Sequence, residues 1–293
     1  MNKASRLKTP QWTGRYSECA WSTADGAKVQ ARCWSVPRPR AQVLIIHGMG
    51  DHSGRFESMA GFLNQNEFSV MAPDLRGHGR SQGQRGYIRN FDALLNDLDL
   101  AVEKTTGTGN GEPVFIYGQS MGGLLVVLHA LKRKPNIAGL IASSPAFRIV
   151  MPAPKWKLAV GKALRHALPR VSLNSGLDIR QLSDVPHEIA RAEADRFRHR
   201  KITPEAFFGM VESGAWCLDS SIPLPAPALL LHGKKDRITD YSATLEFAAT
   251  RHNCSTRIWD NGLHELHNMS NREEARQVIL HFLDHCLSEV HKV

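Results

Sequence analysis

The chain has 293 residues, 42% of them hydrophobic and 22% charged, which excludes a disordered protein and allows one large α/β domain with an insertion, or two modest domains. Lysine and arginine outnumber aspartate and glutamate by 37 to 28, giving a net charge of +9. The basic residues are scattered, without zinc-finger spacing, an RNP-like aromatic motif or a dense basic block, so we do not expect a nucleic-acid partner.

Cysteine usage and the N-terminal segment indicate the compartment. The cysteines lie far apart and contain no Cys-x-x-Cys pair, which argues against a disulfide framework or a zinc site and predicts reduced, mostly packing residues: Cys19, Cys33, Cys217, Cys254 and Cys286. The basic N-terminal segment is not followed by an apolar run, and no later stretch approaches the roughly 18 apolar residues of a membrane span. The sequence therefore predicts a soluble cytoplasmic protein.

Strands and helices are expected to alternate along most of the chain. Residues 15–36 predict two strands around Asp25 and Gly26, a dipeptide suited to a tight hairpin turn. Further strands are predicted at 42–48, 69–74, 113–118, 137–145, 227–233 and 255–260, and helices at 54–65, 91–104, 121–134, 242–251 and 272–287. This alternation predicts a mainly parallel sheet covered by helices on both faces.

The alternation fails between about Phe147 and Trp216, where strand-like runs vanish and Pro, Arg, Lys and helix-forming residues predominate. We interpret this stretch as an insertion. The expected organisation is a first core part at 1–146, an inserted helical cap at 147–216 and a second core part at 217–293.

The stretch VFIYGQSMGGLLVV, residues 114–127, interrupts an apolar run with a single hydroxyl framed by small residues. A strand that ends in G-x-S-x-G and continues as a helix is typical of a nucleophile elbow. Gly118 and Gly122 would let the backbone pass close to itself and project Ser120 outward at the carboxyl end of a parallel strand. We therefore favour Ser120 as a catalytic nucleophile over a structural turn serine.

A serine hydroxyl needs a base and an orienting carboxylate, expected in the chain order Ser, acid, His. Asp236 follows the buried strand at 227–233 and is the favoured acid, whereas Asp240 lies at the start of a helix, where an N-cap role explains it. For the base, His264 lies in a Gly-containing loop nearer the strand end. The competing His267 lies closer to the next helix, where it would cap or pack.

The tetrahedral intermediate also needs N–H donors aimed at its oxyanion. Met121 follows the nucleophile and would supply one backbone amide, and the loop after the strand at 42–48 would supply the second through Met49. His47 in that loop is expected to organise it rather than act as a second base. No cofactor is expected.

Asp74, Arg76, His78 and Arg80 stand in DLRGHGRS, a composition that could suggest a metal or phosphate site. Metal sites usually have fewer positively charged side chains around them, and Gly77 and Gly79 mark turns. We therefore favour a loop held by internal ion pairs and hydrogen bonds, and expect no metal.

Taken together, HGMGDHSGRF, PDLRGHGRSQGQRG, GQSMGG, LLHGKKDRITD and GLHELHN resemble the monoacylglycerol lipase and lysophospholipase branch of the α/β-hydrolase superfamily. These motifs run in family order from about residue 43 to 268. The resemblance implies an α/β-hydrolase fold and a serine ester hydrolase acting on monoacylglycerol or lysophospholipid. It gives Ser120, Asp236 and His264 the triad roles and Met49 and Met121 the oxyanion amides, with Phe147 to Trp216 as a cap over the acyl site.

Three alternatives remain open. One is a short-chain carboxylesterase, and another keeps the fold but carries out C–C hydrolysis, perhydrolysis or aminopeptidase chemistry. The third is a non-enzymatic binder, which an intact triad disfavours.

The insertion also suggests a peripheral contact with an anionic membrane. From Arg148 to Cys217 there are twelve basic and seven acidic residues, and KWKLAVGKALRHAL, residues 155–168, has the composition of an amphipathic helix. An ordinary cap helix that packs on the domain below is an equally good interpretation.

Overall fold

The computed structural model describes residues 16–150 and 155–290, apart from the side chains of residues 155–158, 166 and 290. Its main sheet has eight strands in the order β1-β2-β4-β3-β5-β6-β9-β10. Their bounds are β1 Ser17–Ser22, β2 Lys28–Trp34, β3 Ala41–Ile46, β4 Phe68–Pro73, β5 Val114–Gln119, β6 Gly139–Ser143, β9 Ala228–Gly233 and β10 Cys254–Trp259. From β4 to β10 every neighbouring pair is parallel, while β1 and β2 form the predicted antiparallel hairpin.

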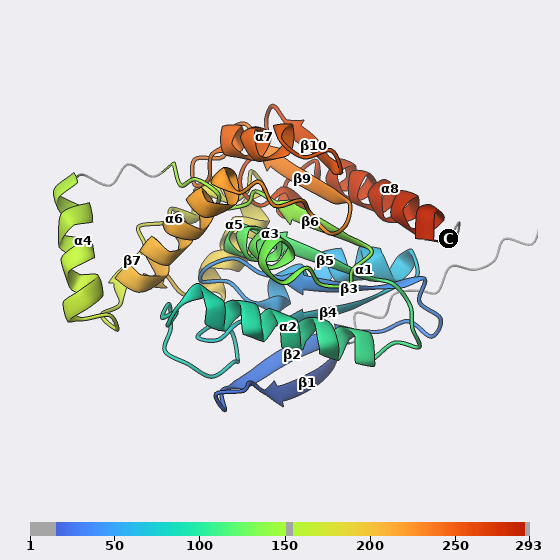
Figure 1. The fold of residues 1–293 in the computed structure, drawn as a ribbon, viewed down its shortest axis with the longest axis horizontal. Coiled ribbons are helices and arrows are strands. Elements are labelled where there is room, and N and C mark those ends of the chain that lie inside the picture. The colour runs from blue at the N-terminus through green and yellow to red at the C-terminus, as the bar shows by residue number, and fades with distance from the viewer. Residues whose placement is uncertain (1–15, 151–154, 291–293) are drawn as a thin grey trace, which may run out of the picture.

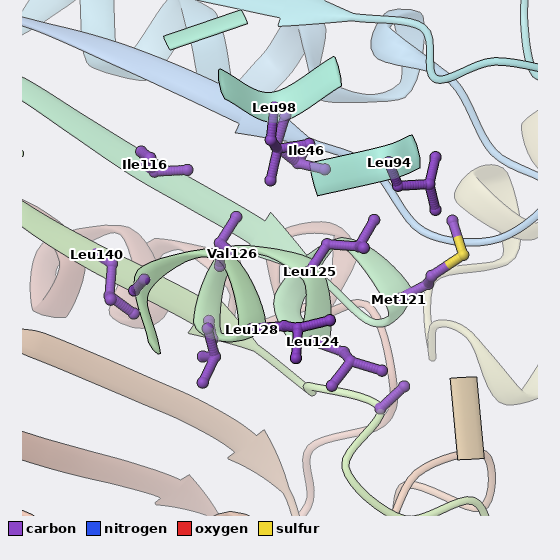
Figure 2. Packing of buried hydrophobic residues seen from close by; sticks show 14 of the residues in the cluster. Ile46, Leu94, Leu98, Ile116, Met121, Leu124, Leu125, Val126, Leu128 and Leu140 are labelled. Carbon is purple, nitrogen blue, oxygen red and sulfur yellow. The ribbon is translucent and has the colours of Figure 1, made fainter. Parts of the chain in front are cut away.

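Helices cover both faces of this sheet (Figure 1). The core helices are α1 Glu57–Gln65, α2 Phe91–Gly107, α3 Met121–Arg133, α7 Tyr241–Ala249 and α8 Arg272–Val290. On one face, α2, α3 and α7 pack on the sheet, and Figure 2 shows Leu98 of α2 beside Ile46 of β3 in this cluster. On the other face, α1 and α8 bury a second cluster. The predicted α/β-hydrolase architecture is confirmed.

One predicted helix begins differently. The stretch expected as a helix over 54–65 opens as a 3₁₀ turn, η1 (Ser53–Phe56), before α1. His52 accepts a hydrogen bond from the Gly54 amide and so starts the chain in this tighter turn. As a result Arg55 is directed into the protein, where it is 2% exposed.

Between β6 and β9 the chain leaves the main sheet. This segment contains α4 Lys155–Ala167, β7 Leu173–Asn174, η2 Ile179–Gln181, α5 Pro186–Ala194, β8 Lys201–Ile202 and α6 Pro204–Asp219. The two-residue strands β7 and β8 pair antiparallel, which the sequence did not predict because two residues carry no detectable alternation. In Figure 1, α4 stands at the left of the molecule, beyond α6.

Part of this segment is hydrogen-bonded to the loop that follows β10. The Glu265 amide donates to the Leu182 carbonyl at 2.8 Å, and the Ser183 hydroxyl donates to the Asn268 carbonyl at 2.7 Å. The Ser270 amide donates to Asp184 at 2.8 Å. Residues 182–184 therefore hold residues 265–270 over their whole length.

Candidate active site

Ser120 lies between the end of β5 and the start of α3, with φ at +56° and ψ at −118°. A positive φ is rare for a residue with a side chain, and it persists only where the surroundings enforce it. Here a Cβ on Gly118 would collide with the Gly122 backbone, and one on Gly122 would collide with the Ile46 carbonyl. The two glycines thus allow the sharp strand-to-helix turn that presents Ser120.

His264 and Asp236 are joined by a hydrogen bond. The His264 Nδ1 atom donates to Asp236 Oδ2 at 2.7 Å, which leaves Nε2 as the nitrogen with a lone pair. Burial lowers the pKa of His264, but the charge of Asp236 and its hydrogen bond outweigh burial and raise it above the ordinary value. Burial opposes ionisation of Asp236, yet the two neighbouring histidines keep the pKa of this carboxyl well below its usual range.

Three further groups hold the Asp236 carboxylate, and their role was not predicted from the sequence. The Thr239 hydroxyl donates to Oδ2 at 2.8 Å, and the Ile238 amide donates to Oδ1 at 2.8 Å. The His232 Nε2 atom lies 3.2 Å from Oδ2. A signal for the turn was present, since an aspartate whose carboxylate accepts from the amides two and three residues further along the chain is typical of an Asx-type turn.

Asp240 and His267, the alternatives to Asp236 and His264, contact other parts of the protein. Asp240 caps α7 by accepting from the Ser242 amide at 2.9 Å and lies 3.1 Å from Arg148, which confirms the expected N-cap role. His267 is stacked on Phe56 with the ring centroids 4.7 Å apart, and burial lowers its pKa to about 4. It does not line the cavity beside Ser120 and packs as a neutral ring instead.

The two residues expected to supply oxyanion amides both lie near Ser120. Met121 is the first residue of α3, so its N–H has no carbonyl one turn earlier in the helix to bond to, and its side chain is fully buried in the core. Met49 lines the cavity next to Ser120. His47 donates to the Gly48 carbonyl at 2.8 Å and accepts from the Leu75 amide at 2.9 Å, so it organises the loop as expected.

A cavity of about 400 Å³ opens in front of Ser120 and His264. Its far walls are formed by the segment between β6 and β9, through apolar side chains that include Leu177, Ile202, Phe207, Phe208 and Met210. The volume is within the range of about 300 to 1,000 Å³ typical of small-molecule sites. Most of its lining surface is apolar, and its polar side chains come both from the residues around Ser120 and from the segment between β6 and β9, as with Arg198 and Lys201.

A buried set of ion pairs lies beside His264. The Arg55 guanidinium donates to Glu265 at 2.8 Å and lies 3.7 Å from Glu188 and 3.9 Å from Asp51. Burial opposes the charge of Glu265, but Arg55 lowers the pKa of this carboxyl to about 2. Arg198 joins the set 3.5 Å from Asp51. No sequence pattern pairs these residues, because they are brought together from four separate segments.

The DLRGHGRS loop is held partly by internal hydrogen bonds, as predicted, but its ion pairs run to other segments of the chain. Asp74 accepts from the amides of Ser53 and Arg80, each at 2.8 Å. Arg76 forms ion pairs with Asp97 at 2.5 Å and with Asp25 at 2.8 Å. Within residues 16–150 and 155–290, no group of three or more His, Cys, Asp or Glu side chains is arranged to hold a metal ion.

Among the residues that the structure describes, no helix combines the length and the apolar composition needed to cross a bilayer.

Comparison with known proteins places the chain in a family. The model of the family described as serine aminopeptidase, S33 (Hydrolase_4) matches residues 37–271. A monoglyceride lipase of Homo sapiens is 30% identical over 90% of this chain and 89% of its own length. An uncharacterised abhydrolase domain-containing protein of Dictyostelium discoideum is also 30% identical, over 89% of this chain, which spans only 28% of that protein.

A solved structure agrees with the sequence matches. The monoacylglycerol lipase of Paleococcus ferrophilus superposes with a TM-score of 0.75 and 28% identity, covering 94% of this chain and 99% of its own. The fold of that lipase and the match to the family model support the same family for this chain. The chain belongs to the serine aminopeptidase S33 family and is an α/β-hydrolase of the monoacylglycerol lipase type, an enzyme that hydrolyses carboxylic esters.

Proposed function

We propose that the protein hydrolyses esters of single-chain lipids, monoacylglycerol or lysophospholipid, through an acyl-enzyme on Ser120. His264 Nε2 takes the Ser120 proton as the hydroxyl attacks the ester carbonyl, and Asp236 stabilises the imidazolium that forms. The amides of Met49 and Met121 donate to the oxyanion. His264 then returns the proton to the leaving alcohol, and a water activated by the same histidine releases the fatty acid.

The observation that carries the substrate class is the cavity. Its mostly apolar walls enclose about 400 Å³ directly in front of Ser120, room for one extended acyl chain rather than a bulky multi-chain lipid. Matches to proteins named monoglyceride lipase support the same class.

We propose that residues 147–216 form the cap over this acyl site, between core parts 1–146 and 217–293. The cavity walls supplied by Leu177, Ile202 and Phe208 support this role, since each comes from that segment. Helix α6 continues to Asp219, three residues beyond the proposed boundary, so the helix links the cap to the core.

A hydrolysis panel tests the substrate class. We expect monoacylglycerol and p-nitrophenyl esters of medium to long chains to be hydrolysed with higher kcat/KM than p-nitrophenyl acetate, because each added methylene buries apolar surface worth about 0.8 kcal/mol. Lysophosphatidylcholine in the same panel separates the two headgroups. Ser120→Ala protein is the matched control for background hydrolysis.

Two other outcomes of this panel would indicate a different activity. Preference for acetyl esters, with no turnover of either lipid, would indicate a short-chain carboxylesterase. Cleavage of an N-terminal amino-acid amide in preference to every ester would indicate aminopeptidase chemistry instead.

We further propose that α4 rests on an anionic membrane surface. The described part of this region is basic and exposed, with Val160 50% and Leu168 53% accessible. The side chains of Lys155, Trp156 and Lys157, on which the sequence argument also relied, lie outside the described residues. Apolar side chains flanked by lysines are typical of interfacial helices.

Cosedimentation with vesicles tests this proposal. We expect wild-type protein to bind phosphatidylglycerol vesicles more than phosphatidylcholine vesicles, with binding weakened by salt. Val160→Asp with Leu168→Asp should reduce binding, whereas Leu245→Asp on α7, 40% exposed, should not. Equal binding by all three proteins would contradict a role for α4.

A further inference from the structure

Two of the five cysteines lie together on the hairpin formed by β1 and β2. Cys33 is opposite Ser17 and Cys19 is opposite Ala31, so the two cysteines are diagonal neighbours on the same face of the pair. Both are partly buried, whereas Cys217 and Cys286 are buried in the two cores. This pairing could not be predicted from the sequence, because only the strand register brings residues 14 positions apart into contact.

The two sulfur atoms are unusually close. Their Sγ–Sγ distance is 2.7 Å, between the about 2.05 Å of a covalent S–S bond and an ordinary non-bonded contact of two sulfurs. No backbone rearrangement is needed to bring them within bonding reach.

The two thiols also differ in the direction in which their pKa is shifted. A hydrogen bond from the Cys33 thiol lowers the pKa of Cys19, although burial opposes this. The same hydrogen bond, with burial, raises the pKa of Cys33. Cys19 is thus the sulfur that ionises first, and the thiolate is the form of cysteine that reacts with oxidants.

We propose that Cys19 and Cys33 are a redox modification site, at which hydrogen peroxide produces a reversible cross-strand disulfide. The Cys19 thiol loses its proton to solvent, and the thiolate attacks a peroxide oxygen. The O–O bond breaks, a sulfenic acid forms on Cys19, and the departing hydroxide leaves as water after taking up a proton. The Cys33 sulfur then displaces hydroxide from the sulfenic acid, which leaves with the Cys33 proton as a second water. Two thiols are oxidised and one peroxide is reduced.

The position of the hairpin indicates what the bond would do. Strand β1 is at the end of the sheet order, on the side away from β9 and β10 (Figure 1). A bond between Cys19 and Cys33 would prevent β1 from separating from β2 and would restrict the unfolded chain. Neither cysteine lines the cavity beside Ser120, so ester hydrolysis should not depend on the bond.

Oxidation followed by peptide mapping tests the proposal. After treatment of the reduced wild-type protein with hydrogen peroxide, we expect one disulfide joining Cys19 and Cys33, a mass lower by two hydrogens and a higher Tm. Dithiothreitol should reverse all three changes. Hydrolysis of a p-nitrophenyl ester should be the same in the oxidised and reduced forms.

Variants distinguish Cys19, which reacts with peroxide, from Cys33, which closes the disulfide. In Cys33→Ser, a dimedone probe should trap a sulfenic acid on Cys19, whereas in Cys19→Ser it should not label Cys33. Cys254→Ser is the matched control and should still form the disulfide. Wild-type protein that yields no Cys19–Cys33 peptide, or that joins either residue to Cys217, Cys254 or Cys286, would overturn the proposal.

Discussion

Ser120→Ala is expected to lower kcat roughly a million-fold, the size of effect seen when a triad serine is removed. The remaining rate should still exceed uncatalysed hydrolysis by about 10³-fold, because the oxyanion amides and the binding cavity are unchanged. The protein should stay folded, since alanine at this position meets the same backbone constraint as serine. Steady-state hydrolysis of a p-nitrophenyl ester and a thermal melt measure both quantities.

A covalent probe provides the control. A fluorophosphonate should label the wild-type chain at Ser120 and should leave the Ser120→Ala variant unlabelled. Ser143 and Ser144 lie next to this region and are fully buried, so they are suitable internal controls. Labelling of another serine, or wild-type turnover by the variant, would remove Ser120 from the mechanism.

Asp236→Asn is expected to lower kcat about 10⁴-fold, because an amide no longer holds His264 in the tautomer that accepts a proton. The pH profile should change as well. Neutral His264 is the active base, so in the wild type kcat/KM should fall as the pH drops through the raised pKa of this histidine. Without the Asp236 charge, burial would lower that pKa, and the acidic limb should move to lower pH.

Asp240→Asn is the matched control, four residues along the same loop. Asparagine keeps an N-cap oxygen for α7, and the variant loses only a surface ion pair with Arg148 worth about 0.2 to 1 kcal/mol. We expect unchanged kcat, an unchanged pH limb and at most a small fall in Tm. Loss of activity at Asp240 alone would reverse the proposed acid.

The elements that could be predicted from the sequence are those that local pattern specifies. Continuous apolar runs predicted the buried parallel strands, and the glycines around Ser120 predicted the turn after β5, because each pattern reflects a local backbone requirement. The 3₁₀ turn at Ser53–Phe56 was missed because one side-chain contact from His52 determines it. Periodicity cannot detect a single cap.

Long-range pairings could not be predicted for a different reason. Arg55 and Glu265 are 210 positions apart, and nothing near either residue identifies the other. The contact between His232 and Asp236 was missed because His232 lies within β9, where a buried histidine is as well explained by packing. Such contacts depend on the assembled tertiary structure.

The bonds between residues 182–184 and residues 265–270 have a mechanical consequence for substrate entry. A movement that pulled Leu182 away from Glu265 would also displace His264, the next residue along the chain. Opening of the cavity without loss of the base therefore requires that η2 and α5 travel with the histidine loop. The wall formed by α4 and β7 is held at other points, through the pairing of β7 with β8 and the ion pair between Arg165 of α4 and Glu205 of α6, so its displacement would not pull on the histidine loop through Leu182.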